Sequence, residues 1–194
     1  MAKMRRSLVA LALSLALAAP ARGASAELLR PGEAAPLFTL KSLNGERSKV
    51  DQVALKSHVG EAPVAPKKLV VLTFGASYCE PCKLELQELE KAKKDLEASG
   101  ALIWCVAVDT DPEGIRKMGA IAEALGLTIP VLADRFGVIA RRYRVDTLPA
   151  LVAIGSDGLV LGARSGYEPL AAKKLVRDLL GQTRSSSAGR AGRR

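Results

Sequence analysis

The sequence is poor in the side chains that usually bind transition metals. Its 194 residues include a single histidine, His58, and only three cysteines. A zinc site built on Cys79 and Cys82 would need two more ligands, and His58 and Cys105 are the only softer ones left. Cys105 stands inside an apolar run, which favours a buried free thiol, and His58 stands in an irregular segment typical of a loop. The composition therefore disfavours a zinc centre.

The chain also lacks a basic face that could bind nucleic acid, although its net charge is +9. Residues 1–26 carry four basic side chains and no acids, and residues 184–194 carry four more and no acids. Without these eight, the middle of the chain keeps 21 basic residues against 20 acidic ones. A domain so close to neutral does not carry the electrostatic footprint of a nucleic-acid-binding protein. We expect no nucleic-acid partner.

No apolar run is long enough to cross a bilayer comfortably, because a spanning helix needs about 20 apolar residues. The longest run, Leu8–Ala19, follows Lys3, Arg5 and Arg6 and precedes the small-residue pattern Ala24-Ser25-Ala26. These features are typical of a signal peptide, and no cysteine directly follows the run to accept a lipid. We expect an exported, extracytoplasmic protein, tethered to the membrane only if the leader stays uncleaved. Export places the cysteines in a disulfide-permissive compartment.

The remaining chain contains no internal repeat, and its pattern alternates strands with helices. Buried strands are predicted over Lys68–Phe74 and Ala101–Val108, and a helix is predicted after each. A hairpin turning at Ser156-Asp157-Gly158 and a closing helix complete the pattern. This order predicts an α/β three-layer domain in which the first two strands run parallel. We expect the domain over 27–183, after a signal peptide (1–26) and before a basic, disordered tail (184–194).

Two cysteines, Cys79 and Cys82, mark the junction between the first buried strand and the first long helix. The N-terminus of a helix stabilises negative charge, and thiols placed there have pKa values of about 3.5–7.5 instead of about 8.5. Pro81 suits the first helical position, where no amide donor is needed. A purely structural disulfide would gain little from closing so small a loop. The spacing therefore favours a cycling dithiol in which Cys79 attacks and Cys82 resolves the mixed disulfide.

Three segments resemble one family. "TFGASYCEPCK" is similar to the active-site segment of the TlpA/ResA-like thiol–disulfide oxidoreductases, which are exported reductases. "PGEAAPLFTLKSLNGE" resembles the opening that they share with peroxiredoxins, and the segment from Thr128 to Gly166 resembles their distal half. The resemblance covers residues 31–181. It implies a thioredoxin-like fold with a central mixed sheet, helices on both faces and an N-terminal extension.

The resemblance also implies roles for residues near the cysteines. Pro149 is expected to be cis and to face the cysteine pair, with the backbone of Leu148 free to bind substrate and Tyr78 beside Cys79 as a docking contact. Three positions depart from the family pattern. Gly75 and Tyr78 replace common tryptophans, and Thr73 replaces the buried aspartate of thioredoxin. The base for Cys82 is then Glu80, a water-mediated group or a distal acid.

The resulting expectation is an exported monomeric reductase of protein disulfides that needs no cofactor beyond its own Cys79–Cys82 disulfide. By analogy with the family, its substrates would include apocytochrome c, and a membrane thiol protein would supply electrons. One alternative is a peroxiredoxin-type peroxidase, although Ala76 stands where such enzymes carry a threonine. The other is a non-enzymatic copper-delivery module, although His58 lies upstream rather than far downstream of the cysteines.

Overall fold

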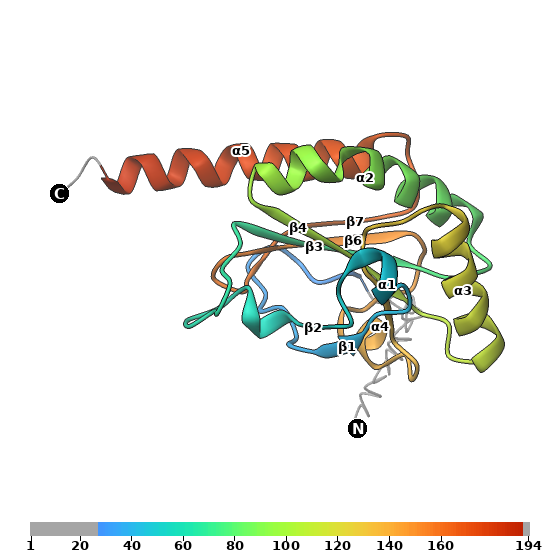
Figure 1. The fold of residues 1–194 in the computed structure, drawn as a ribbon. Coiled ribbons are helices and arrows are strands. Elements are labelled where there is room, and N and C mark those ends of the chain that lie inside the picture. The colour runs from blue at the N-terminus through green and yellow to red at the C-terminus, as the bar shows by residue number, and fades with distance from the viewer. Residues whose placement is uncertain (1–26, 192–194) are drawn as a thin grey trace, which may run out of the picture.

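A five-stranded mixed sheet forms the centre of the protein (Figure 1). The structure is a computed structural model that describes residues 27–191, so the predicted leader lies outside the described residues. The strand order is β5-β4-β3-β6-β7. The strands are β3 (Leu69–Gly75), β4 (Ala101–Ala107), β5 (Val131–Ala133), β6 (Ala150–Gly155) and β7 (Val160–Ser165). The predicted α/β fold with a central mixed sheet is confirmed.

Strand β3 occupies the middle of the sheet because all of its side chains are apolar or small and can be buried on both faces. It pairs in parallel with β4 from Leu69 to Gly75 and antiparallel with β6 from Leu69 to Phe74. Strand β5 continues the sheet in parallel beyond β4, and β7 is the hairpin partner of β6. The carboxyl ends of β3, β4 and β5 therefore meet at one edge of the sheet.

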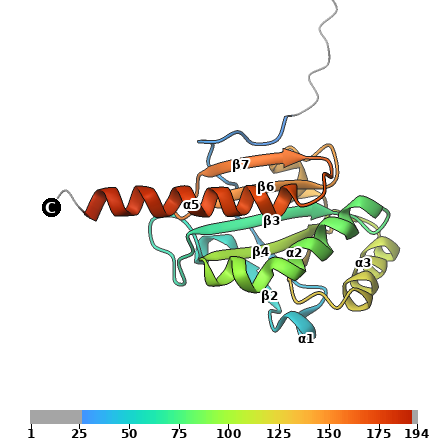
Figure 2. The same ribbon diagram turned by 90° about the horizontal axis from the view of Figure 1, so that it is seen from above.

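One face of the sheet is covered by α2 (Glu80–Ala98), α3 (Pro112–Ala124) and α5 (Ala171–Ala191), and Figure 2 shows α2 and α5 running alongside each other. Leucines of α2 and α5 share one buried core with the odd-numbered residues of β3. The N-cap residue of α2 is Cys79, and the N-cap residue of α3 is Asp111. The Asp111 carboxylate accepts the Gly114 amide at 2.8 Å.

The opposite face is covered by α4 (Val138–Arg142), the 3₁₀ helix η1 (Leu55–Ser57) and an N-terminal extension. The extension contains the hairpin of β1 (Thr39–Lys41) and β2 (Gln52–Ala54), with the short helix α1 (Gly45–Ser48) between them. Buried Asn44 fastens it to the sheet, because its side chain bonds the backbones of Leu127, Ile129 and Val131 at 2.9–3.0 Å. The predicted N-terminal extension is thus an integral layer of the fold.

The C-terminal helix differs from the sequence-based expectation. Residues 184–194 were expected to be disordered, but α5 continues to Ala191 and extends beyond the sheet (Figure 1). A helix already nucleated on the core propagates at little cost, and alanine and arginine are good helix formers. Within residues 27–191, no helix has both the length and the apolar character needed to cross a membrane.

Candidate active site

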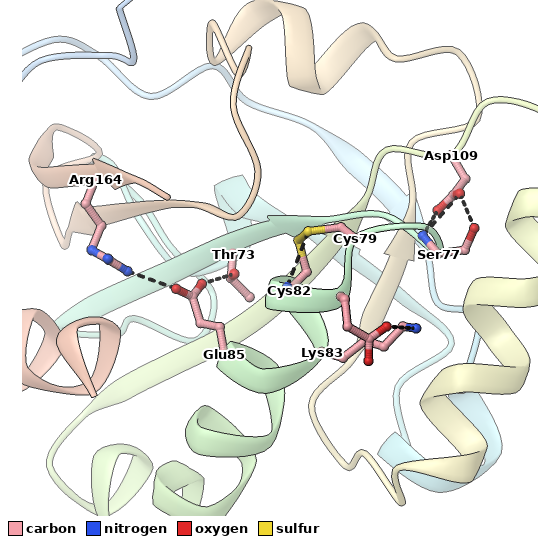
Figure 3. Close-up of a disulfide and its surroundings, with 9 residues drawn as sticks. Thr73, Ser77, Cys79, Cys82, Lys83, Glu85, Asp109 and Arg164 are labelled. Atoms are coloured by element: carbon pink, nitrogen blue, oxygen red, sulfur yellow. Dashed lines mark hydrogen bonds and ion pairs between the residues drawn. A yellow bond between two sulfur atoms is a disulfide. The ribbon is translucent and has the colours of Figure 1, made fainter. Parts of the chain in front are cut away.

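The cysteine pair lies at the junction between the end of β3 and the start of α2. Cys79 is the N-cap of α2, and Cys79 and Cys82 are joined by a disulfide (Figure 3). The Cys82 amide donates to the Cys79 sulfur at 3.3 Å. The same amide, with the positive end of the helix, would stabilise a thiolate on Cys79 after reduction. Pro81 lies in the first turn of α2 at its second residue, one place later than expected, because Cys79 itself is the cap.

The two sulfurs differ in their access to solvent. Cys79 is 8% exposed and Cys82 is 2% exposed, so an incoming disulfide meets Cys79 first. Gly75 explains how Cys82 packs so closely on the sheet. A Cβ atom at Gly75 would lie 3.2 Å from the Cys82 Cβ and 3.6 Å from its sulfur. Gly75 therefore allows the Cys82 side chain to pack directly against the backbone at the end of β3.

The peptide bond between Leu148 and Pro149 is cis, as the family resemblance implies. Leu148 packs against the small cluster formed by Ala76, Cys79 and Cys82, so the loop before β6 reaches the disulfide. Tyr78 is 74% exposed and adjoins Cys79 along the chain. These positions suit the substrate contacts predicted for Leu148 and Tyr78, which remain predictions.

Glu80, the candidate base nearest to Cys82 in sequence, points away from the pair. Its side chain is 75% exposed and forms an ion pair with Lys83 at 2.5 Å. In this position Glu80 contributes a favourable negative charge to the first helical turn. The geometry favours a distal acid over Glu80 as the group that exchanges protons with Cys82.

A buried acid in such a position is Glu85, one helical turn beyond Cys82 and only 1% exposed. Its carboxylate accepts the Thr73 hydroxyl at 2.7 Å and pairs with the Arg164 guanidinium at 2.9 Å (Figure 3). Burial raises the pKa of Glu85 above its ordinary value, while Thr73 and Arg164 partly oppose the shift. Side chains three residues apart on a helix lie on one face, about 5–6 Å apart at Cβ. Glu85 is therefore a buried carboxyl group on the helix face of Cys82, in a position suited to proton exchange with it.

Sequence reasoning missed Glu85, although one signal was present. Glu85 stands three residues after Cys82, and at that helical spacing it shares the buried face of Leu86 and Leu89 rather than the solvent face. The hydroxyl at Thr73 marks the same place from β3, where thioredoxin carries its aspartate. In this chain the strand supplies a hydroxyl at this place, and the helix supplies the carboxylate that accepts from it.

A second buried carboxylate, Asp109, holds the loop that precedes Cys79. It accepts the Ser77 amide at 3.0 Å and the Ser77 hydroxyl at 2.7 Å, and both residues are buried. The Cys79 amide in turn donates to the Ala76 carbonyl at 3.0 Å. The loop between β3 and α2 is thus fixed from the end of β4. No local sequence pattern indicates this pair, because its members are separated by 32 residues.

Cys105 is a buried free thiol, as the sequence predicts. It lies on β4 directly beside Thr73 of β3. Burial, followed by the nearby charges of Glu85 and Asp109, raises the pKa of Cys105 far above its ordinary value.

His58 packs against Trp104, with the two ring centroids 5.4 Å apart, and its Nδ1–H donates to the Ala65 carbonyl at 2.8 Å. Among residues 27–191 no cluster of three or more histidine, cysteine, aspartate or glutamate side chains could hold a metal ion.

The burial of Cys105 has a measurable consequence. We expect iodoacetamide to modify Cys79 readily in the reduced, folded protein and to leave Cys105 unmodified, because alkylation needs an accessible thiolate. Peptide mass mapping after labelling measures both residues. The same labelling in denaturant is the control and should modify all three cysteines. Modification of Cys105 at the rate of Cys79 in the folded protein would contradict its assigned burial.

The fold and the site together define a class: thioredoxin-fold proteins that carry a dithiol–disulfide pair at the start of a helix, opposite a cis-proline loop. A family model described as the AhpC/TSA family matches residues 31–162. The chain belongs to the AhpC/TSA family.

Individual relatives agree with the ResA/TlpA-like resemblance. Thioredoxin-like protein YneN of Bacillus subtilis is 29% identical over 132 residues, which are 68% of this chain and 69% of the relative. Thiol-disulfide oxidoreductase ResA of the same organism is 26% identical over 143 residues, covering 74% and 72%. A Chlorobium tepidum structure assigned as thiol:disulfide interchange protein DsbE superposes with a TM-score of 0.65 at 24% identity, covering 80% of this chain and 99% of that one. That last likeness supports the fold.

Proposed function

We propose that this thioredoxin-fold thiol–disulfide oxidoreductase works outside the cytoplasm and reduces the disulfides of other proteins. The observation that carries the proposal is the Cys79 sulfur at the N-cap of α2, accepting the Cys82 amide and more exposed than its partner. A reduced Cys79 placed in this way is an activated nucleophile, and Cys82 is held behind it as the resolving thiol.

The chemistry balances over two thiol–disulfide exchanges. The Cys79 thiolate attacks one sulfur of the substrate disulfide, which forms a mixed disulfide and expels the first substrate thiolate. The Cys82 thiolate then attacks the Cys79 sulfur, which releases the second substrate thiolate and closes the Cys79–Cys82 disulfide. Two electrons pass from the enzyme to the substrate. The two protons of the enzyme dithiol end on the substrate thiols or in solvent.

We assign the proton of Cys82 to Glu85. A buried carboxyl group whose pKa is raised above its ordinary value exchanges protons more effectively near neutral pH than an exposed one. Thr73 and Arg164 hold both carboxylate oxygens, which fixes the orientation of Glu85 on the helix face of Cys82. The exposed Glu80, paired with Lys83, then has no part in the proton transfer.

The cellular setting of the proposal rests on the sequence and on the named relatives. The leader-like residues 1–26 support export, and relatives named thiol-disulfide oxidoreductase support a protein disulfide as substrate. We propose apocytochrome c as one such substrate, by the family resemblance, and a membrane thiol protein as the electron donor. The protein would act as a monomer, with the Cys79–Cys82 disulfide as its only redox group.

A redox titration of the Cys79–Cys82 couple against glutathione or dithiothreitol tests the direction of electron flow. We expect a potential near that of thioredoxin, about −270 mV, because a reductase must give up electrons readily. Quenching with acid and counting free thiols by mass spectrometry measures the reduced fraction at each ratio. A potential near about −120 mV, as in strongly oxidising members of the fold, would overturn the reductase assignment.

A peroxidase is the second candidate, because the AhpC/TSA match includes the opening segment shared with peroxiredoxins. Ala76, three residues before Cys79, leaves no hydroxyl where those enzymes carry a threonine. Consumption of hydrogen peroxide by the reduced protein, followed by loss of free thiols in a stopped-flow experiment, separates the two functions. Rapid consumption would favour the peroxidase, and slow background oxidation would favour the reductase.

A further inference from the structure

The chain contains seven aromatic side chains, three Phe, three Tyr and one Trp, yet two of them are strongly exposed. Tyr78 beside Cys79 is 74% exposed, and Phe136 is 79% exposed. Phe136 follows the carboxyl end of β5, and Cys79 follows the carboxyl end of β3. Because β3, β4 and β5 are parallel, these ends lie at one edge of the sheet. An aromatic-poor protein thus exposes aromatic side chains at the edge that carries its disulfide.

Hydrogen bonds fix the conformation of the turn that carries Phe136, and in this conformation the ring lies in solvent. The Gly137 amide donates to the Asp134 carbonyl at 2.9 Å, and Gly137 has the left-handed φ of 60° that this turn requires. The buried Asp134 carboxylate accepts the Ala140 amide at 2.8 Å. Arg141 donates to the Phe136 carbonyl at 2.9 Å. The exposure of Phe136 is therefore fixed by backbone anchors on both sides of the residue.

Phe136 borders a pocket of about 310 Å³. Strand β1 lies beside β5 where Ser42 bridges Leu132. The pocket lies between the Thr39–Lys41 strand and the Asp134–Phe136 turn, where the two segments no longer pair. Its apolar lining includes Leu40, Val138 and Ile139. The pocket is large enough for one large apolar side chain.

The exposed charges around this pocket are all positive. Lys41 and Arg135 line it, and both are exposed. Within residues 27–191 neither forms an ion pair. The acid that lines it, Asp134, is buried and already bonded to the Ala140 amide. The solvent side of the pocket therefore offers two free cations, which complement carboxylates.

The pocket is also joined to the redox site through the backbone. The Asp134 amide donates to the Ala107 carbonyl at 3.0 Å, and a Cβ at Gly137 would lie 3.5 Å from the Thr110 side chain. Thr110 follows Asp109, which fixes Ser77 in the loop before Cys79. The Phe136 turn and the Cys79 loop are thus held by the same short segment after β4.

We propose that this pocket docks the disulfide-bearing substrate protein. The occupant would be an acidic segment that inserts one large apolar side chain between Leu40 and Val138, stacks against Phe136 and places carboxylates near Lys41 and Arg135. The inference rests on the proposed function, because it assigns a substrate class to that reaction. Docking away from the sulfurs would let the enzyme distinguish protein substrates without contacting their cysteines.

The test uses the full-length mature protein and two synthetic disulfide peptides. Both carry the same disulfide loop and a leucine in the following segment. In one peptide two glutamates flank the leucine, and in the other two lysines do. Dithiothreitol recharges the enzyme, so that no protein electron donor takes part. A single turnover of pre-reduced enzyme, freed of dithiothreitol, with the neutral small disulfide 4,4′-dithiodipyridine normalises each variant for its chemistry at Cys79.

For Phe136→Ala we expect kcat/KM for the acidic peptide, normalised in this way, to fall about tenfold, as expected for loss of one buried aromatic contact. For the double variant Lys41→Glu/Arg135→Glu we expect the preference to reverse in favour of the lysine peptide, and in the wild-type protein we expect the preference to weaken with salt. Val64→Ala is the matched control, because Val64 is 90% exposed and precedes β3 at the other end of the sheet. It should leave both normalised rates unchanged.

The outcomes separate the two proposals. A wild-type protein that reduces neither the peptides nor dithiodipyridine overturns the proposed function. A wild-type protein that reduces all of them, with normalised rates unaffected by Phe136→Ala and by charge reversal, overturns the docking site alone. An effect of Phe136→Ala that vanishes on dilution of the enzyme would assign the pocket to a second copy of the chain and overturn the substrate assignment.

Discussion

Cys82→Ser is expected to accumulate a covalent complex with a disulfide-containing substrate protein, whereas the wild-type protein shows none at steady state. Cys79 would still attack, because its helix position and the amide at residue 82 are unchanged by the substitution. The mixed disulfide would then persist, because the hydroxyl of serine is far less nucleophilic than a thiolate. Non-reducing gel electrophoresis after an acid quench detects the complex, and dithiothreitol should release it.

Cys79→Ser is the matched variant and should form no complex. Turnover in that variant should fall to the rate of the assay without enzyme, since Cys82 is 2% exposed and cannot replace Cys79 as the nucleophile. Cys105→Ala serves as a second control and should retain turnover, because this thiol is buried and protonated. Full catalytic cycling by Cys82→Ser, or a complex trapped by Cys79→Ser, would reverse the assigned roles.

Arg164→Ala is expected to lower the free energy of unfolding at pH 7 by about 3 kcal/mol, because it leaves the Glu85 carboxylate buried without its cation. Arg164 is itself largely buried, with 18% of its side chain exposed, so solvent screens the pair little. Urea unfolding followed by circular dichroism measures the change. In the double variant Glu85→Gln/Arg164→Ala most of the loss should be recovered, because the neutral amide can still accept the Thr73 hydroxyl.

The pH dependence of these variants follows from the pKa of Glu85. Because burial raises this pKa in the folded state, the stability contributed by the protonated group is fully present below its ordinary value of 4.5 and is lost as pH rises through the folded pKa. The stability of the wild-type protein relative to Glu85→Gln should therefore decrease as pH rises above about 4.5, by at most about 1.4 kcal/mol per pH unit. The loss caused by Arg164→Ala should shrink at acidic pH. A loss independent of pH would show that Arg164 acts by packing alone.

The elements that carry the site were predictable because their signals are local. The apolar run at β3, the cap position of Cys79 and the leucines of α2 are each visible within a few residues. The cis peptide bond before Pro149 could be predicted only through the family resemblance. The order of strands and helices then constrained the rest of the sheet.

The buried acid on the helix face of Cys82 was harder to predict, because its environment is assembled from distant parts of the chain. Glu85 and Arg164 are 79 residues apart, and Ser77 and Asp109 are 32 apart. Glu80 was the natural candidate by sequence distance, yet the start of the helix turns it to solvent beside Lys83. The extent of α5 is difficult to predict for another reason. A low-complexity tail can continue a helix once packing on the core has formed the first turns, because nucleation is the unfavourable step of helix formation.

The central position of β3 has a kinetic meaning as well as a structural one. Its backbone is hydrogen-bonded to neighbouring strands on both sides over nearly its whole length. Amide hydrogens in such a strand exchange with solvent only when the whole domain opens. The reactive sulfur is thus joined, within a few residues, to the part of the molecule that opens least often. A substrate protein must therefore approach Cys79 in the folded state. Opening of the fold is too rare to expose this sulfur further.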